Sequence, residues 1–99
     1  LLRVRSIAQN DAHIYCTPEQ LEEELTATFR LTLDYYRRLR FEGVKVRFSK
    51  HDPENRAKFI ENAEAWAHSE AIVKRVIDDA GVEYEVGEGE AAFYGPKID

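Results

Sequence analysis

The sequence predicts an α+β domain in which a mainly antiparallel sheet carries two helices on one face. Two stretches repeat apolar residues at helical spacing, and several short segments alternate apolar with polar residues, which is the pattern of half-buried strands. The elements follow in the order strand, helix, strand, helix, strand, strand. With both helices on one face, the other face of the sheet is free to hold a site.

The first element, residues 2–16, has few helix signals, and we interpret it as one long strand or as a hairpin kinked near Gln9 and Asn10. Successive side chains of a strand point to opposite faces, and this segment separates into a polar and an apolar side. The apolar side should meet the helices, and the polar side is either a site or an ordinary solvated face. The polar side would carry Arg3, Arg5, Ile7, Gln9, Asp11, His13 and Tyr15, and the apolar side Ala8, Ala12, Ile14 and Cys16.

Capping signals predict where the two helices begin and end. The first helix, at about 18–40, starts with Thr17 as N-cap, Pro18 at the first helical position and Gln20 completing a capping box. Asn62 caps the second helix, and Gly81 ends it. The apolar faces would consist of Leu21, Leu25, Phe29, Leu33 and Tyr36 in the first helix and of Trp66, Val73, Val76 and Ile77 in the second.

Three shorter strands are predicted from alternation and from turn residues. Residues 44–48 alternate apolar and polar side chains, and so do residues 82–86. Residues 91–94 should begin the last strand, after two turn-forming glycines. Asp52 and Pro53 repeat the cap-then-proline signal and should open a short helical turn.

Composition restricts the classes of function. A chain of 99 residues forms one domain, and its net charge of −5 argues against a general basic surface for nucleic acid. The sequence shows no membrane-spanning segment and no signal peptide, so we expect a cytoplasmic location. A single cysteine excludes an internal disulfide. The chain has no methionine and stops inside a predicted strand, which suggests an excised or engineered fragment.

Two segments resemble signatures of one enzyme family. Residues 3–20, RVRSIAQNDAHIYCTPEQ, resemble the ATP-binding strand of class II synthetases in the form found in threonyl-tRNA synthetases, RVRxFxQDDAHIFCT. Residues 89–99, GEAAFYGPKID, resemble a second signature of that family. The resemblance covers essentially the whole chain, which implies that residues 1–99 form a single domain, part of a class II catalytic domain.

The resemblance implies specific roles for five residues. In the family, the glutamine and the second aspartate of QDDAH help to hold threonine, and they match Gln9 and Asp11. The histidine of that run is a ligand of a zinc ion that binds the amino and hydroxyl groups of threonine, and it matches His13. The tyrosine that helps to bind threonine matches Tyr94, and the lysine that faces the active site matches Lys97.

The ATP end of the site follows from the same resemblance. Arg3 falls on an arginine of the ATP-site strand, so Arg3 and Lys97 are the candidate catalytic residues and Mg-ATP is the implied nucleotide. Ile7 stands where the family has an aromatic residue that stacks on adenine. Ala8 and Asn10 also depart from the family pattern, which puts ATP binding by this chain in question.

The zinc site would be incomplete in this chain. The family's other two ligands, a cysteine and a second histidine, lie outside it, and one ligand cannot hold the metal. Cys16 is no substitute, since positions i and i+3 of a strand point to opposite faces. Without the family context His13 would read as a structural residue, and His51 and His68 are interpreted as surface residues. We therefore expect the isolated chain to bind no cofactor.

The resemblance implies a parent enzyme that activates threonine with ATP and transfers it to tRNA, acting as a homodimer. For the isolated chain we expect a monomer that is inactive alone. The alternative is an excised or engineered structural scaffold derived from the synthetase fold. No residue in the chain is an obvious nucleophile, because Cys16 is placed on the core side without a base.

Overall fold

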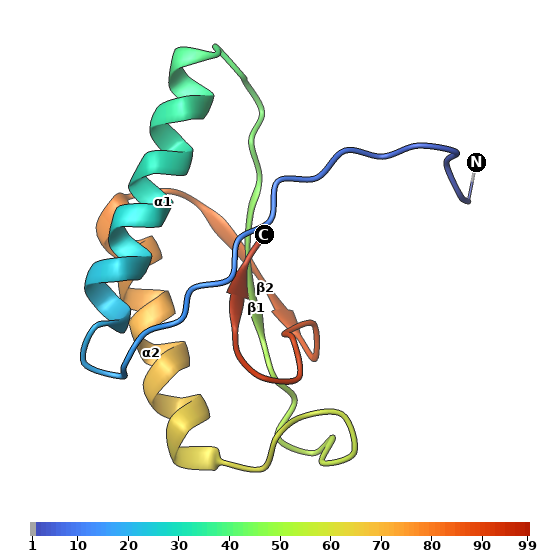
Figure 1. Ribbon diagram of the computed structural model, residues 1–99, viewed down its shortest axis with the longest axis vertical. Helices are drawn as coiled ribbons and strands as arrows, with labels where there is room; N and C mark the ends of the chain where they lie inside the picture. Colours follow the sequence, from blue (N-terminus) through green and yellow to red (C-terminus); the bar gives the residue numbers. More distant parts are fainter. Residues whose placement is uncertain (1) are drawn as a thin grey trace.

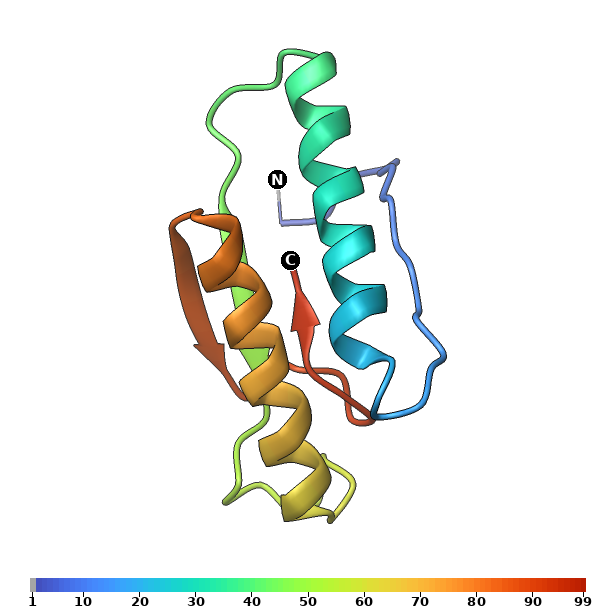
Figure 2. The ribbon, with the colours of Figure 1, turned by 90° about the vertical axis from the view of Figure 1, so that its left-hand side faces the viewer.

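A computed structural model describes residues 2–99, which form two helices packed on one face of a three-stranded sheet. Figure 2 shows both helices in front of the sheet, and Figure 1 shows the two layers from the side. None of the helices in residues 2–99 has the length and hydrophobicity that crossing a membrane requires. The elements are α1 (Leu21–Arg38), β1 (Val46–Lys50), α2 (Ala63–Ala80), β2 (Tyr84–Glu88) and β3 (Lys97–Ile98).

The α+β class is confirmed, but the prediction of a mainly antiparallel sheet is wrong. The strand order is β2-β1-β3, with β1 parallel to β2 and antiparallel to β3, so the sheet is mixed. The reason is the connection between β1 and β2. Helix α2 carries the chain back to the end of the sheet at which β1 began, and a strand that starts there runs parallel to β1.

The predicted first strand is absent from the described residues. Residues 2–19 contain no strand, and Ala8 and Ala12 are exposed, although Ile14 and Cys16 are half-buried. Figures 1 and 2 show this segment passing along the side of the molecule where β3 lies and then leaving the body. Alternation can favour an extended backbone, but a strand also needs an edge to pair with, and the two-residue β3 offers little edge.

Helix α1 begins three residues later than predicted. Residues 18–20 form a turn, and half of the predicted capping box is present: the Thr17 N–H donates to Oε1 of Gln20 at 3.1 Å. The Gln20 N–H donates to the Thr17 carbonyl oxygen at 3.0 Å, which closes that turn. The prediction of Thr17 as the N-cap is therefore wrong, since Gln20 occupies the cap position without a side-chain cap hydrogen bond and the regular α-helix follows the turn.

The predicted limits of α2 are confirmed. Oδ1 of Asn62 accepts a hydrogen bond from the Ala65 N–H at 3.1 Å, and Gly81 ends the helix with a φ of 71°. A positive φ is strained for residues with a Cβ, which explains the glycine. Residues 52–61 contain turns but no helix; Oδ1 of Asp52 accepts from the Glu54 N–H at 3.0 Å, an Asx-turn.

The core lies between the two helices and β1. Ile77 is fully buried, and Phe29 is the buried residue of α1. Arg75 and Glu22 form an ion pair of 2.6 Å that links the helices at the surface. A second, smaller cluster consists of Phe59, Trp66 and Ala91. The buried members of the main core are Phe29, Val46, Phe48, Ile72, Val73, Val76 and Ile77.

Candidate functional site

A contact between His13 and Tyr94 joins the two ends of the chain. Nε2 of His13 and the hydroxyl oxygen of Tyr94 are 2.6 Å apart and form a hydrogen bond across 81 positions of sequence. The ring centroids are separated by 5.8 Å. Both residues are exposed, so the pair lies on the surface and is open to a ligand.

A tight turn, rather than the predicted strand at 91–94, carries Tyr94. The Gly95 N–H donates to the Ala92 carbonyl oxygen at 3.3 Å, which reverses the chain before β3. The Ile60 N–H donates to the Phe93 carbonyl oxygen at 3.0 Å and ties this turn to the loop before α2. The Phe93 ring meets the Tyr94 ring edge to face, with centroids 5.0 Å apart. Tyr94 therefore sits on a turn held from two sides.

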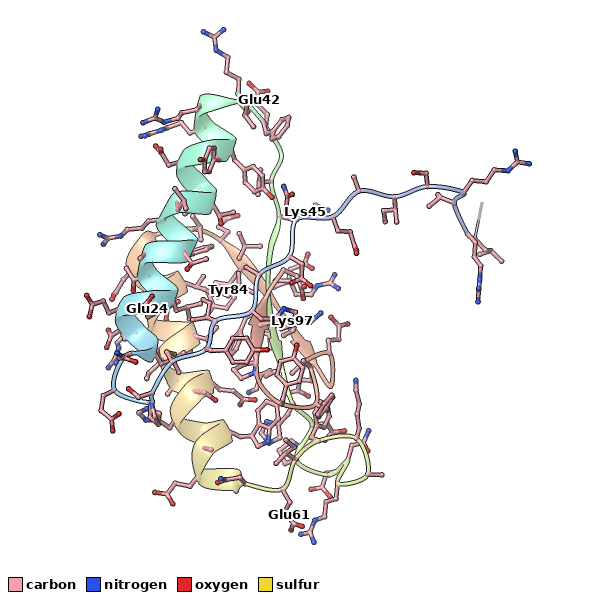
Figure 3. All side chains as sticks on the ribbon, viewed as in Figure 1. Glu24, Glu42, Lys45, Glu61, Tyr84 and Lys97 are labelled. Carbon is pink, nitrogen blue, oxygen red and sulfur yellow. The ribbon has the colours of Figure 1, made fainter. Side chains whose placement is uncertain are left out.

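Lys97 lies on β3 (Figure 3). It belongs to a polar cluster that also contains Ser49 and Asp99. It is paired in register with Ser49 of β1, and its Nζ lies 3.2 Å from Oδ1 of Asp99. The fully buried Ser49 donates from Oγ to Oδ2 of Asp99 at 2.6 Å. The Asp99 carboxylate thus bridges a buried hydroxyl and the exposed ammonium of Lys97.

The other predicted site residues remain on the extended segment. Arg3, Gln9 and Asp11 are exposed, and Ile7 is 72% exposed. Within residues 2–99 the structure shows no hydrogen bond or ion pair from these four side chains to Tyr94 or Lys97. Of the predicted site residues, the structure therefore brings His13 and Tyr94 into contact and leaves the ATP-end residues apart.

The residues at this site do not fit a complete zinc centre. Across the described part of the chain no three residues among His, Cys, Asp and Glu are grouped closely enough to hold a metal ion. Catalytic zinc needs three protein ligands and an open position. Nε2 of His13 is hydrogen-bonded to the Tyr94 hydroxyl, and Cys16 is half-buried. Residues 2–99 therefore provide no closed coordination set for a zinc ion.

The interpretation of His51 as a surface residue is wrong. Its side chain is only 14% exposed, and its Nδ1 lies 2.5 Å from Oε1 of Glu70, whose side chain is 13% exposed. The sequence offers one signal for this contact. Trp66 and Glu70 are four residues apart on α2 and share a face, so the carboxylate lies beside the indole on which the His51 ring stacks. His68, in contrast, is exposed as expected.

A second polar cluster, made of Arg47, Glu85 and Glu90, lies on the sheet beside β2. Nη1 of Arg47 lies 3.1 Å from Oε2 of Glu90, and Nη2 lies 3.4 Å from Oε2 of Glu85. The negative charge of Glu90, followed by a hydrogen bond to Glu85, raises the pKa of Arg47 above its usual value. The Glu90 carboxylate lies against Gly87, which has no Cβ to displace it. The arrangement is a local ion-pair network in which the acidic groups already have a cationic partner.

The comparisons with known proteins agree with the fold and with the two signatures. Residues 1–99 match the model of the tRNA synthetase class II core domain (G, H, P, S and T), and the chain belongs to that family. Within it, the chain is 46% identical over 99 residues to the threonine–tRNA ligases of Pelodictyon phaeoclathratiforme and Chlorobaculum tepidum, and 42% identical to that of Staphylococcus saprophyticus. The inferred resemblance to threonyl-tRNA synthetases is confirmed.

Solved structures give the same assignment. The RNA binding domain of threonyl-tRNA synthetase from Cryptosporidium parvum superposes with a TM-score of 0.72 at 30% identity over 85% of this chain and 20% of that one. A protein described as a threonyl-tRNA synthetase from Aeropyrum pernix gives 0.69 at 27% identity, covering 83% of this chain and 20% of that one. The chain spans 15% of the length of each of the ligases named above.

Proposed function

We propose that the chain forms part of the aminoacyl-adenylate site of a threonine–tRNA ligase, which activates threonine with ATP, transfers it to tRNA and works as a homodimer. The observation that carries the proposal is the hydrogen bond between His13 and Tyr94, because it brings the two family signatures together at one point on the surface. Family membership over residues 1–99 supports it. With a net charge of −5, this part of the enzyme is a poor tRNA surface, and tRNA would be held mainly elsewhere.

The threonine end of the site would use Gln9, Asp11 and Tyr94. A fixed carboxylate is a strong partner for the ammonium group of an amino acid, because a charge-assisted hydrogen bond contributes roughly 1.5 to 3 kcal/mol. Asp11 lies two residues before His13 and is exposed, so its carboxylate is available to a ligand beside the His13–Tyr94 pair. Gln9 adds an amide that can both donate and accept.

The ATP end would use Arg3, Ile7 and Lys97. Cations stabilise the charge that develops when the carboxylate of threonine displaces pyrophosphate from ATP, and Mg²⁺ accompanies the nucleotide. Lys97 supplies an exposed ammonium on β3, and Arg3 and Ile7 are exposed on the extended segment. The proposal requires that segment to lie over the sheet when ATP is bound.

His13 would be one zinc ligand, completed by residues from other parts of the ligase. Bound zinc would supply a Lewis acid that engages the amino group and hydroxyl of threonine. An apolar pocket separates a hydroxyl from a methyl only weakly, whereas a site that binds the hydroxyl rejects valine strongly. In this chain, Tyr94 orients the His13 ring through Nε2, so a zinc ion would bind at Nδ1 or would have to displace the phenol.

Tyr94→Phe in the complete ligase tests the proposal, because it removes only the hydroxyl. The KM for threonine in ATP–pyrophosphate exchange should rise about tenfold, the equivalent of one good hydrogen bond, while the KM for ATP stays within about twofold. Tyr35→Phe is the matched control, since Tyr35 is a similarly exposed tyrosine on α1. Equal changes in both constants, or no change in either, would remove Tyr94 from the threonine site.

For the chain of residues 1–99 alone, we propose an inactive structural unit. The separation of Arg3 and Ile7 from Tyr94 and Lys97 favours this description, since a ligand would have to order the extended segment at a cost in conformational entropy. Calorimetric titration with threonine and with Mg-ATP should show no binding tighter than about 1 mM, the weak end of ligand affinities. A stoichiometric micromolar site would contradict this.

A further inference from the structure

His51 and Glu70 form a half-buried pair that the proposed site does not use. The Nδ1 of His51 lies 2.5 Å from Oε1 of Glu70, and the backbone N–H of His51 donates to the same oxygen at 2.9 Å. A carboxylate only accepts hydrogen bonds, so Nδ1 is the donor. Two bonds from one residue to one oxygen fix the His51 ring where the chain leaves β1.

The fixed imidazole lies flat on the indole of Trp66. The two ring centroids are 4.4 Å apart and the planes differ by 12°, while Phe59 meets both rings edge to face. The indole N–H of Trp66 in turn donates to the carbonyl oxygen of Ile60 at 2.7 Å. The His51–Glu70 pair therefore fixes the position of the Trp66 ring by stacking. Trp66 in turn fixes the loop before α2 through its hydrogen bond to Ile60.

Ile60 is the residue that holds the turn carrying Tyr94. Its N–H donates to the carbonyl oxygen of Phe93, the neighbour of Tyr94. From the other side, the Ala91 N–H donates to the carbonyl oxygen of Lys50, next to His51, at 3.3 Å. The buried Ala91 packs with Phe59 and Trp66. Every link between Glu70 and the Tyr94 turn is thus a hydrogen bond or a ring contact of the structure.

We propose that His51 and Glu70 are positioning residues for Tyr94. The pair fixes Trp66, which fixes the Ile60 loop and so the turn on which the Tyr94 hydroxyl meets His13. The role in threonine binding rests on the proposed function, whereas the effect on the Tyr94–His13 contact does not. A loop residue needs such support, because a displacement of about 1 Å at a site can cost about a hundredfold in rate.

Substitutions can separate the two contacts of His51. His51→Phe retains a ring to stack on Trp66 and removes the Nδ1 donor, whereas His51→Asn retains a donor near Nδ1 and removes the stack. Glu70→Gln keeps an acceptor oxygen and is the mild variant that preserves the fold. His68→Ala is the matched control, since His68 is an exposed histidine of α2.

The first readout is the Nε2 resonance of His13 in the ¹⁵N-labelled chain. Only three histidines are present, so each is assigned by its removal, and Tyr94→Phe supplies the signal without the hydrogen bond. His51→Phe and His51→Asn should move the His13 signal toward that reference, Glu70→Gln should move it part of the way, and His68→Ala should leave it unchanged. The emission of Trp66, the one tryptophan of the sequence, reports in parallel on the cluster.

The second readout is the KM for threonine of the same variants in the complete ligase. We expect a rise of about tenfold for His51→Phe with the KM for ATP within about twofold, since a displaced Tyr94 affects one substrate. An unchanged His13 resonance in Glu70→Gln and both His51 variants, or one that moves equally in His68→Ala, overturns the proposal. A shifted resonance with an unchanged KM for threonine supports the positioning of Tyr94 and counts against Tyr94 as a threonine-binding residue.

Discussion

Nε2 of His13 lies 2.6 Å from the hydroxyl oxygen of Tyr94, although 81 positions of sequence separate the two residues. The contact attaches the extended N-terminal segment to the turn before β3. It also occupies the imidazole nitrogen that faces Tyr94, so a ligand at that nitrogen has to displace the phenol. The His13–Tyr94 pair is therefore both a tertiary contact between the two ends of the chain and part of the proposed site.

The first prediction concerns zinc. Because residues 2–99 contain no group of three metal-ligating side chains, calorimetric titration of the chain should show no specific zinc site tighter than about 1 mM. His13→Ala should leave the titration unchanged. A stoichiometric micromolar site that His13→Ala abolishes would show that this chain holds the metal without help.

The second prediction concerns Ile7 and adenine. In the complete ligase, Ile7→Phe should lower the KM for ATP roughly twofold to tenfold, because stacking on an aromatic ring contributes about 1 to 3 kcal/mol relative to alanine and isoleucine already supplies part of it. Val4→Phe is the matched control, since Val4 is another exposed aliphatic residue of the segment. Equal gains from the two substitutions would mean that Ile7 is not under the purine.

The third prediction separates the core from the extended segment. Ile77→Ala should lower the free energy of unfolding by roughly 2 to 5 kcal/mol, because Ile77 is fully buried between the helices and the sheet. Ile14→Ala should cost about 1 kcal/mol or less, since Ile14 is only half-buried and its segment pairs with no strand of the described sheet. Urea melts measure both. Equal losses would mean that residues 2–16 pack as an integral strand.

The fourth prediction concerns Gly87. A Cβ at this position would clash with Oε2 of Glu90, so Gly87→Ala should displace that carboxylate and break its ion pair with Arg47. Because both partners are exposed to solvent, which screens their attraction, the loss in unfolding free energy should be small but measurable. In a Glu90→Ala background the same substitution should cost nothing. A cost that persists there would place the clash on the Arg47 side chain, whose Cδ would lie 3.3 Å from the new Cβ.

The fifth prediction concerns the pH dependence of stability. A hydrogen bond from Arg37, together with a hydrogen bond and the charge of Arg38, lowers the pKa of Asp34 below 3.8. A depressed carboxyl pKa stabilises the fold above the unfolded-state pKa, and this contribution is lost as the pH falls through the folded-state value. The difference in unfolding free energy between the chain and Asp34→Asn should therefore be present at neutral pH and shrink below about pH 4.

The control for this pH series is Asp79→Asn. Asp79 is exposed on α2, and the structure shows no ion pair for it within residues 2–99. The difference in unfolding free energy between Asp79→Asn and the unsubstituted chain should vary less between neutral pH and pH 2 than the corresponding difference for Asp34→Asn. A difference for Asp34→Asn that stays constant over this range would show that Arg37 and Arg38 do not act on the carboxylate in solution.

Features decided within a few residues could be predicted from the sequence. Asn62 and Gly81 mark the ends of α2 because each acts on backbone groups close to it in the chain. Phe29 and Ile77 lie in the core as their helical spacing predicts. The two signatures near the ends of the chain identified the family for the same reason, since a motif is a local string of residues.

Features that need two distant segments were decided by the tertiary structure alone. Residues 2–16 have the alternation of a strand but found no edge to pair with, and β2 runs parallel to β1 because α2 returns the chain to the end where β1 began. The contacts of His13 with Tyr94 and of His51 with Glu70 likewise depend on closing long loops. Local patterns carry no information on which distant partner a polar side chain will meet, so only the folded chain shows how the candidate site is held.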